Sequence, residues 1–207
     1  MKRKKRLRIL FFLALIIFLG GYLLLKFSWL TLYSIDEMKY NARIVDSSIS
    51  PPPNFLNVWD RLYPDSRHNG MNNQLLSELT AEIAKTKFRD CKCDEIGYLA
   101  WNNDNYNFKF NLDKGIGKYR RFGYGLQYYT TPAKCFDFWL NNGIIWNGRY
   151  LKNLNELSTI TLNKNIESLN QNEVIQLIAY RQLSYNRAND STVFSETVNK
   201  LTANLKE

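Results

Sequence analysis

The chain is poor in the residues that most metal and nucleotide sites need. His68 is its only histidine, and it has three cysteines in all. A structural zinc site needs about four nitrogen or sulfur ligands, and no second Cys-x-Cys or Cys-x-x-Cys pair supplies the missing ones. Gly115 and Gly117 stand without the rest of either nucleotide-binding fingerprint. The sequence therefore predicts no metal site and no phosphate loop of these classes.

Acidic residues are absent before Asp36, so the net charge of +9 is unevenly distributed. Seven of the 28 Lys and Arg residues lie in that first part, which leaves 21 cations against 19 acids, a net of +2, for the rest. Six of the seven stand at the start: Lys2, Arg3, Lys4, Lys5, Arg6 and Arg8. A basic tail beside an apolar run is explained more simply by membrane orientation than by nucleic-acid binding. We expect no nucleic-acid partner.

The apolar run itself extends from Ile9 to Leu25, 17 residues without a charge, and apolar residues continue beyond Lys26. That length can span a bilayer. A cleavable signal peptide is the competing interpretation, but its apolar core is usually shorter and ends at small residues, which the sequence from Trp29 to Tyr33 lacks. We expect an uncleaved, single-pass signal anchor in a bacterial plasma membrane, with the N-terminus in the cytoplasm.

The remaining length suits one compact domain, because about 170 ordered residues can bury a single sizeable core. The proline run Pro51-Pro52-Pro53 cannot continue a helix and favours an extended segment. The stretch before it is a stalk or the first element of the domain. We therefore divide the chain into a cytoplasmic tail (1–8), an anchor (9–32), a stalk or linker (33–53) and an extracytoplasmic domain (54–207).

The three cysteines, Cys91, Cys93 and Cys135, would then lie on the exported side, where disulfides form. One residue separates Cys91 from Cys93, a spacing at which a mutual disulfide would be strained, so either could instead pair with Cys135. One thiol is left over in either case.

Apolar residues at three- and four-residue intervals predict several helices in the exported part. One is expected over residues 72–88, and others over 151–162, after Asn170, and after Asp190 or Ser191. Asp190 or Ser191 can cap the last of these helices.

Thr131 followed by Pro132 predicts a further helix start, because a hydroxyl cap satisfies a free amide and proline presets φ. Residues 141–150 contain two glycines and are expected to form a loop. Near residues 105 to 110, aromatic and polar residues alternate, which indicates a short strand or hairpin.

The second half of the chain resembles family-51 peptidoglycan glycosyltransferases, lysozyme-like enzymes that polymerise lipid II. The matching stretches are Trp139-Leu140-Asn141, Asn147-Gly148, residues 153–158, 162–164 and 169–177, and Gln182-Leu183-Ser184-Tyr185-Asn186. Their order and most of their spacings agree with scaffold motifs of that family. The resemblance implies a mainly α, lysozyme-like domain with a small β element, preceded by one N-terminal transmembrane helix.

The family's first catalytic motif, Glu-Asp-x-x-Phe-x-x-His, is matched only in part. Aligning Asp60 with its aspartate puts Tyr63 at the aromatic position and places His68 two residues late. Trp59 then stands where the glutamate base belongs, and an indole cannot accept a proton, so Asp60 is the candidate base. The alternative is an ordinary turn at Tyr63-Pro64-Asp65-Ser66, with its acids and His68 in solvent.

The most basic stretch outside the anchor contains Lys109, Lys114, Lys118, Arg120 and Arg121. By resemblance, Lys114, Lys118, Arg120 and Arg121, together with His68, are candidates for binding the diphosphate of a lipid-linked substrate. Guanidinium forks match phosphate oxygens, and lysine supplies a point charge. Tyr119 stands at the position of the family's second glutamate. The alternative is a solvated basic face attracted to anionic lipids.

These residues leave open whether the protein is an enzyme. The first hypothesis is a membrane-anchored glycosyltransferase-like protein that acts on or binds lipid II; the family's divalent cation, Mg²⁺, is implied only if activity survives. The second is a degenerate relative that binds or scaffolds in the cell envelope, because binding needs complementarity but no positioned base. The third is an unrelated anchored helical domain. The expected partners are the membrane, lipid-linked glycan or peptidoglycan, and other envelope proteins.

Overall fold

The structure, a computed structural model, describes residues 2–72, 74, 91–102, 108–109, 118–142 and 144–205. Helices make up most of this part, which confirms the mainly α fold class. They are α1 (Lys2–Lys26), η1 (Ser28–Thr31), α2 (Ile35–Asp46), α3 (Pro53–Leu62), α5 (Lys92–Asn102), α6 (Lys118–Tyr129), α7 (Pro132–Asn141), α8 (Leu154–Leu162), η3 (Ile166–Ser168), α9 (Gln171–Gln182), α10 (Tyr185–Ala188) and α11 (Ser191–Asn204). Strands β1 (Ile145–Trp146) and β2 (Arg149–Tyr150) form an antiparallel pair.

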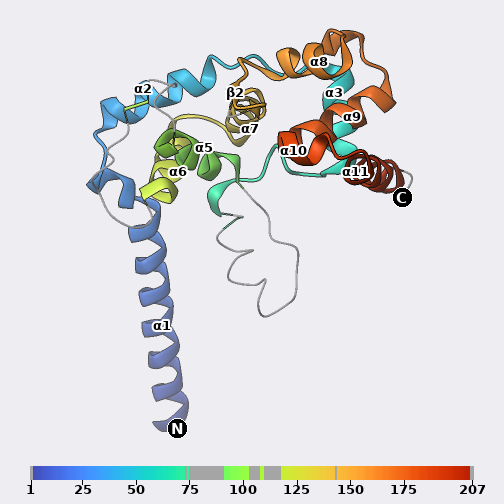
Figure 1. The fold of residues 1–207 in the computed structure, drawn as a ribbon. Coiled ribbons are helices and arrows are strands. Elements are labelled where there is room, and N and C mark those ends of the chain that lie inside the picture. Colours follow the sequence, from blue (N-terminus) through green and yellow to red (C-terminus); the bar gives the residue numbers. More distant parts are fainter. Residues whose placement is uncertain are drawn as a thin grey trace.

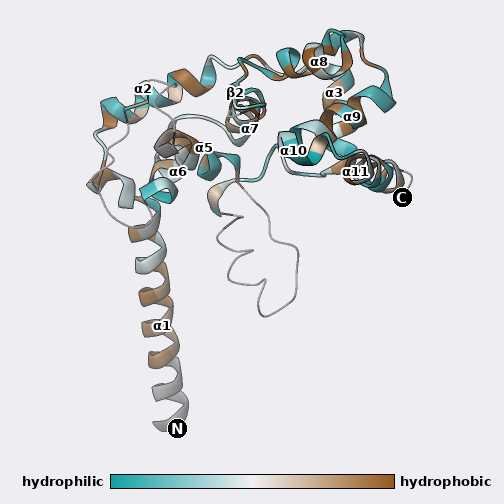
Figure 2. Ribbon diagram, in the orientation of Figure 1, coloured by the Kyte–Doolittle hydropathy of each residue, from teal (hydrophilic) through white to brown (hydrophobic). Residues whose placement is uncertain are grey.

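Helix α1 projects from the rest of the protein as a single rod (Figure 1). Most large apolar side chains between Ile9 and Leu24 are exposed, and Figure 2 colours much of this rod as hydrophobic. Within the described part of the chain, no helix is long and apolar enough to cross a membrane.

Two buried clusters form the core of the protein. The proximal core lies among η1, α2, α5 and α6, near the end of α1, and the distal core lies among α3 and α8 to α11. Helix α7 contributes to both: Cys135 and Phe138 enter the proximal core, whereas Phe136 and Leu140 enter the distal core. Residues three or four apart share a helix face, so two faces of α7 join the two halves.

The predicted helix starts are confirmed by their caps. The Thr131 hydroxyl accepts a hydrogen bond from the backbone N–H of Lys134 at 3.2 Å, and Pro132 is the first residue of α7. Asn170 and Glu173 form a reciprocal capping box at α9. The Asp190 carboxylate accepts from two backbone N–H groups of α11. Each side chain satisfies donors that the first turn of a helix leaves unpaired.

The small β element lies in the predicted loop at 141–150. Asn147 and Gly148 have φ values of +49° and +73°, the left-handed pair that a tight hairpin between β1 and β2 requires. Phe108 and Lys109, in the stretch where a strand was expected, are not in a strand. The rest of residues 105–110 lies outside the described residues, as do residues 75–88 of the helix predicted over 72–88.

The segment before the proline run contains a packed helix. Met38, Ala42 and Val45 of α2 are buried, and α2 packs against α6 and α7. The Asn41 side chain both donates to the backbone carbonyl of Lys109 and accepts from its N–H, at 3.0 and 2.8 Å. Residues 35–46 therefore belong to the folded domain.

Candidate functional site

Trp59, which occupies the position of the family's glutamate, is a core residue. Its indole is 4% exposed and its ring lies 4.8 Å from Tyr63, 5.3 Å from Phe136 and 5.9 Å from Phe55, between ring centroids. Its Nε1–H donates to the Ser66 hydroxyl at 2.9 Å. The residue fills the distal core and satisfies its one polar atom there, so it is not available to a substrate.

Asp60 lies on the outer face of α3 in a solvated ion pair. Its carboxylate is 3.3 Å from the Arg67 guanidinium, and the Asp60 side chain is 48% exposed. The predicted turn is confirmed: the Ser66 N–H donates to the Tyr63 carbonyl, and Asp65 has a φ of +65°. His68 follows the turn and is exposed. This arrangement matches the turn interpretation better than an enclosed catalytic base.

The predicted basic site begins at the first turn of α6. Lys118 is buried, Arg121 is half-buried, and the Arg120 guanidinium lies 3.9 Å from the Asp94 carboxylate. Lys114 lies outside the described residues. Helix α6 belongs to the proximal core and α3 to the distal core, so Asp60 and Lys118 stand on different halves (Figure 1).

Tyr119, at the position of the family's second glutamate, serves the contact between two helices. A Cβ on Gly97 of α5 would meet the Tyr119 carbonyl oxygen at 2.4 Å. The Tyr119 ring lies edge-on to that of Tyr98, with 6.5 Å between centroids. Only glycine permits such an approach of two backbones. In the described part of the chain, no three His, Cys, Asp or Glu residues are grouped to hold a metal ion.

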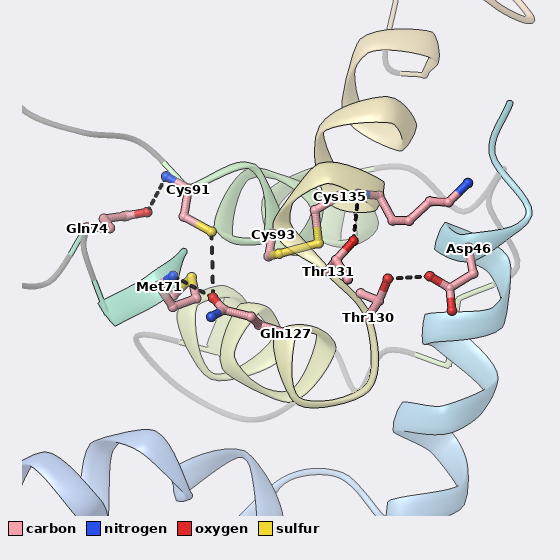
Figure 3. The surroundings of a disulfide bond; sticks show 10 residues. Asp46, Met71, Gln74, Cys91, Cys93, Gln127, Thr130, Thr131 and Cys135 are labelled. Carbon is pink, nitrogen blue, oxygen red and sulfur yellow. Dashed lines mark hydrogen bonds between the residues drawn. A yellow bond between two sulfur atoms is a disulfide. The ribbon is translucent and has the colours of Figure 1, made fainter. Parts of the chain in front are cut away.

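A disulfide joins Cys93 of α5 to Cys135 of α7 (Figure 3), which settles the pairing that the sequence left open. Cys91 is the remaining thiol and is fully buried. Its backbone N–H donates to the Gln74 side chain at 2.7 Å, and its Sγ lies 4.0 Å from the Gln127 side-chain oxygen. Burial raises the pKa of the Cys91 thiol to about 11. This cysteine therefore stays protonated and unreactive near neutral pH.

A groove of about 710 Å³ lies between the proline segment, the end of α7, the start of α8 and η3. We call it the asparagine groove. Its lining includes the serines Ser47, Ser48 and Ser50, the prolines Pro51 to Pro53, and the asparagines Asn141, Asn142, Asn153, Asn155 and Asn165. Lys152 and Glu167 are its only charged lining residues, so the groove has no net charge.

Three side chains of α7 hold the wall of the asparagine groove. Lys134 Nζ donates to the Ser48 carbonyl at 3.2 Å, and Asn141 Nδ2 donates to the Ile49 carbonyl at 2.7 Å. The Ser50 hydroxyl donates to Asp137, whose carboxylate is 2% exposed, at 2.5 Å. These three positions are spaced three and four residues apart on one face of the helix. They fix residues 48 to 50 as an extended wall.

The asparagines on the opposite side are oriented by backbone contacts. The Oδ1 atoms of Asn153 and Asn165 accept backbone N–H groups as caps of α8 and η3, and Asn155 Oδ1 accepts from Ile166 N–H, each at 2.9 Å. Within the described residues, no hydrogen bond involves the Nδ2 groups of these three side chains. A carboxamide carries two donors and one acceptor atom, so each can donate to a ligand without giving up its structural bond.

Sequence reasoning missed this groove because four separate segments of the chain form it. The caps were visible as asparagines before helical periods, but their meeting with the proline segment depends on the tertiary fold. No family model, no curated protein and no solved structure matches this chain.

Proposed function

We propose that the protein is a membrane-anchored, extracytoplasmic domain of the bacterial cell envelope that binds peptidoglycan glycan or its lipid-linked precursor, as a binding or scaffolding protein without catalysis. The observation that carries the binding role is the asparagine groove. The anchor and the compartment are supported by other features.

The anchor is supported by α1. Apolar side chains such as Phe18, Leu19 and Leu24 are 56–76% exposed on a helix that stands apart from the two cores. The sequence continues the apolar run to Leu25, and these 17 residues, roughly 25 Å at 1.5 Å per residue, correspond to the lower end of the range of about 17–25 residues for a transmembrane helix. Basic residues before the run support an N-terminus in the cytoplasm.

The compartment is supported by the disulfide between Cys93 and Cys135. Disulfides persist in oxidising compartments and are rare in the reducing cytosol of mesophiles. With the N-terminus in the cytoplasm and one membrane span before the disulfide, the domain that carries the disulfide would lie outside the cytoplasm. The two observations agree on the same topology.

The ligand class follows from the chemistry of the groove. Carboxamides and hydroxyls offer donors and acceptors without charge, which suits the hydroxyl and acetamido groups of an N-acetylated glycan. Side chains that the backbone already orients lose little freedom when a ligand binds. The groove is open at the surface and about 710 Å³ in volume, within the usual range of ligand pockets.

Catalysis is not part of this proposal, because the two positions that the family gives to glutamates hold Trp59, in the core, and Tyr119, in a helix contact. The active glycosyltransferase remains the second candidate on one observation, the exposed carboxylate of Asp60. An active glycosyltransferase would need Asp60, the basic residues of α6 and a Mg²⁺ ion to come together in one site.

The binding test uses the full chain in lipid nanodiscs, with tetra-N-acetylchitotetraose and lipid II as ligands. Asn153→Asp combined with Asn165→Asp keeps an acceptor oxygen at both caps, since aspartate caps helices as asparagine does, but removes the Nδ2 donors. Asn170→Asp is the matched control, because Asn170 caps α9 and does not line the groove. Each neutral hydrogen bond is worth about 0.5–1.5 kcal/mol, so we expect about a 5- to 100-fold loss of affinity in the double variant.

An equal affinity in the double variant and in Asn170→Asp would contradict binding in the asparagine groove. Lipid II polymerisation with Mg²⁺ separates the two candidates. Polymer formed by the wild-type chain and lost in Asp60→Asn would refute the non-catalytic proposal and support the glycosyltransferase. Binding without polymer supports the scaffold.

A further inference from the structure

Three exposed apolar side chains lie near the point where α1 meets the domain. Phe27, Leu30 and Tyr128 are 38%, 50% and 58% exposed. Phe27 and Leu30 follow α1 directly, and Tyr128 comes from the last turn of α6. We call these three residues, together with Lys26, the collar. Figure 1 shows the end of α6 beside the end of α1 that carries this junction.

The collar is fixed rigidly to α1. The Phe27 and Tyr128 rings lie 6.3 Å apart, and the Lys26 ammonium is 5.9 Å from the Phe27 ring. Below them Trp29, 2% exposed, packs 5.9 Å from both Tyr128 and Tyr129. The Phe27 N–H donates to the Leu23 carbonyl and continues the helical bonding of α1. The helix and the collar therefore move as one body.

The height of the collar follows from the helix. Leu24 lies near the end of the exposed apolar surface of α1, and its side chain is 76% exposed. Phe27 comes three residues later, about 5 Å further at 1.5 Å per residue, and the Tyr128 ring lies 6.3 Å from the Phe27 ring. Leu30 belongs to η1, which begins just after α1 ends. A headgroup layer is about 5 to 8 Å thick on each side of the hydrocarbon. If Leu24 ends the hydrocarbon-embedded part of α1, the collar lies at the level of the headgroups.

We propose that the collar is a second membrane contact, which seats the domain on the lipid headgroup layer; this rests on the anchor of the proposed function. A tyrosine ring suits that layer because its apolar body and hydroxyl reach into different surroundings. The Lys26 ammonium is placed to pair with lipid phosphates. The occupant is a phospholipid surface, because the collar continues the exposed apolar surface of α1.

The contact gives the domain a fixed orientation. The proximal core, with η1 and α6, lies next to the end of α1, and Figure 1 shows the distal core displaced sideways from the axis of α1. A domain on a loose tether would sample all orientations, whereas a seated domain presents its asparagine groove at one height above the membrane.

Photocrosslinking of the full chain tests the contact. We would place p-benzoyl-phenylalanine at four positions, one chain at a time, in liposomes of phosphatidylethanolamine and phosphatidylglycerol: Tyr128 and Leu30 in the collar, Phe18 in α1, and Ile160 in α8. Ile160 is 49% exposed and belongs to the distal half, so it is the matched control for an exposed apolar side chain. Lipid adducts are counted by mass spectrometry.

We expect lipid adducts at Phe18 and, at Tyr128 and Leu30, several-fold more than at Ile160. Adducts at Phe18 with both collar positions at the level of Ile160 would overturn the collar and leave the anchor standing. Collar adducts to protein in place of lipid would overturn it in favour of a protein partner. No lipid adduct at Phe18 would overturn the anchor and the collar together. Leu30 decides the outcome if the variant at Tyr128 fails to fold.

Discussion

Removal of the Cys93–Cys135 disulfide should lower the free energy of unfolding by about 4 kcal/mol. The bond closes a loop with a sequence separation of 42, and the chain-entropy relation assigns about 13 cal/mol/K to such a loop, close to 4 kcal/mol at 25 °C. A typical domain is stable by about 5–15 kcal/mol. Removing the disulfide therefore costs a large part of the total free energy of unfolding. It also removes the covalent bond between α5 and α7.

The double variant Cys93→Ala/Cys135→Ala measures this loss, by urea unfolding of the full chain in detergent micelles. Cys91→Ala is the matched control, because Cys91 is as deeply buried as the bonded pair but carries no disulfide. The loss of unfolding free energy in Cys91→Ala reports the removal of one buried sulfur atom. Twice that loss is subtracted from the loss measured for the double variant. The remainder should be close to the loop-closure figure.

A remainder near zero would refute the reasoning, since the loop would then be constrained by packing alone. Reductant offers a second route to the same comparison, because it opens the bond and leaves both sulfur atoms in place. Wild-type chain in reductant should then lose about the loop-closure figure alone, less than the full loss of the double variant, while the double variant itself should not respond.

Three further predictions follow from local contacts. Gly97→Ala should cost about 1–3 kcal/mol in urea unfolding, because its Cβ would stand 2.4 Å from a backbone oxygen of α6. Gly20→Ala, with nothing within 4 Å and inside a helix, should cost nothing or stabilise by up to about 1 kcal/mol, and a cost equal to that of Gly97→Ala would contradict the close crossing. A hydrogen bond from Lys164, with the capping box, lowers the pKa of Glu173 below its ordinary 4.5. Its contribution is therefore present above pH 4.5 and lost as the pH falls through the lowered value, so Glu173→Gln should flatten the acid limb of a stability-against-pH curve; an unchanged limb would exclude it. The Cys91 thiol, with its pKa raised to about 11, should give no reaction with a disulfide reagent at pH 8 in the folded chain and one equivalent after unfolding. Fast labelling of the folded chain would show that the pocket around it opens.

Much of the fold could be predicted because its signals are local. Thr131, Asn170 and Asp190 are cap residues that act within their own first turn, so their sequence context suffices. The hairpin at Asn147-Gly148 was interpreted only as a loop, although that dipeptide is a strong turn signal. Its two strands have two residues each, too short for an alternating pattern to appear.

The site could not be predicted to the same extent, because its parts meet only through tertiary packing. The burial of Trp59 was not predicted, although its spacing from Phe55 and Leu62 is that of one apolar helix face. The side chains of Asp137 and Asn141, which hold the proline segment, contact residues roughly 90 positions away in the chain. Periodic patterns in the sequence predict local structure and cannot indicate contacts between such distant residues. Likewise, spacing alone could not choose between Cys91 and Cys93 as the partner of Cys135.

Helix α7 contributes side chains to both cores, and this has a mechanical consequence. One face of this helix is bonded through Cys135 to α5, which packs on α6 beside the anchor junction, and the same helix holds the wall of the asparagine groove. A force on the wall of the groove that α7 holds could therefore pass along α7 and through the disulfide to α5. If the proposed function holds, the Cys93–Cys135 disulfide lies on the path that connects the glycan-binding groove to the anchored end of the domain.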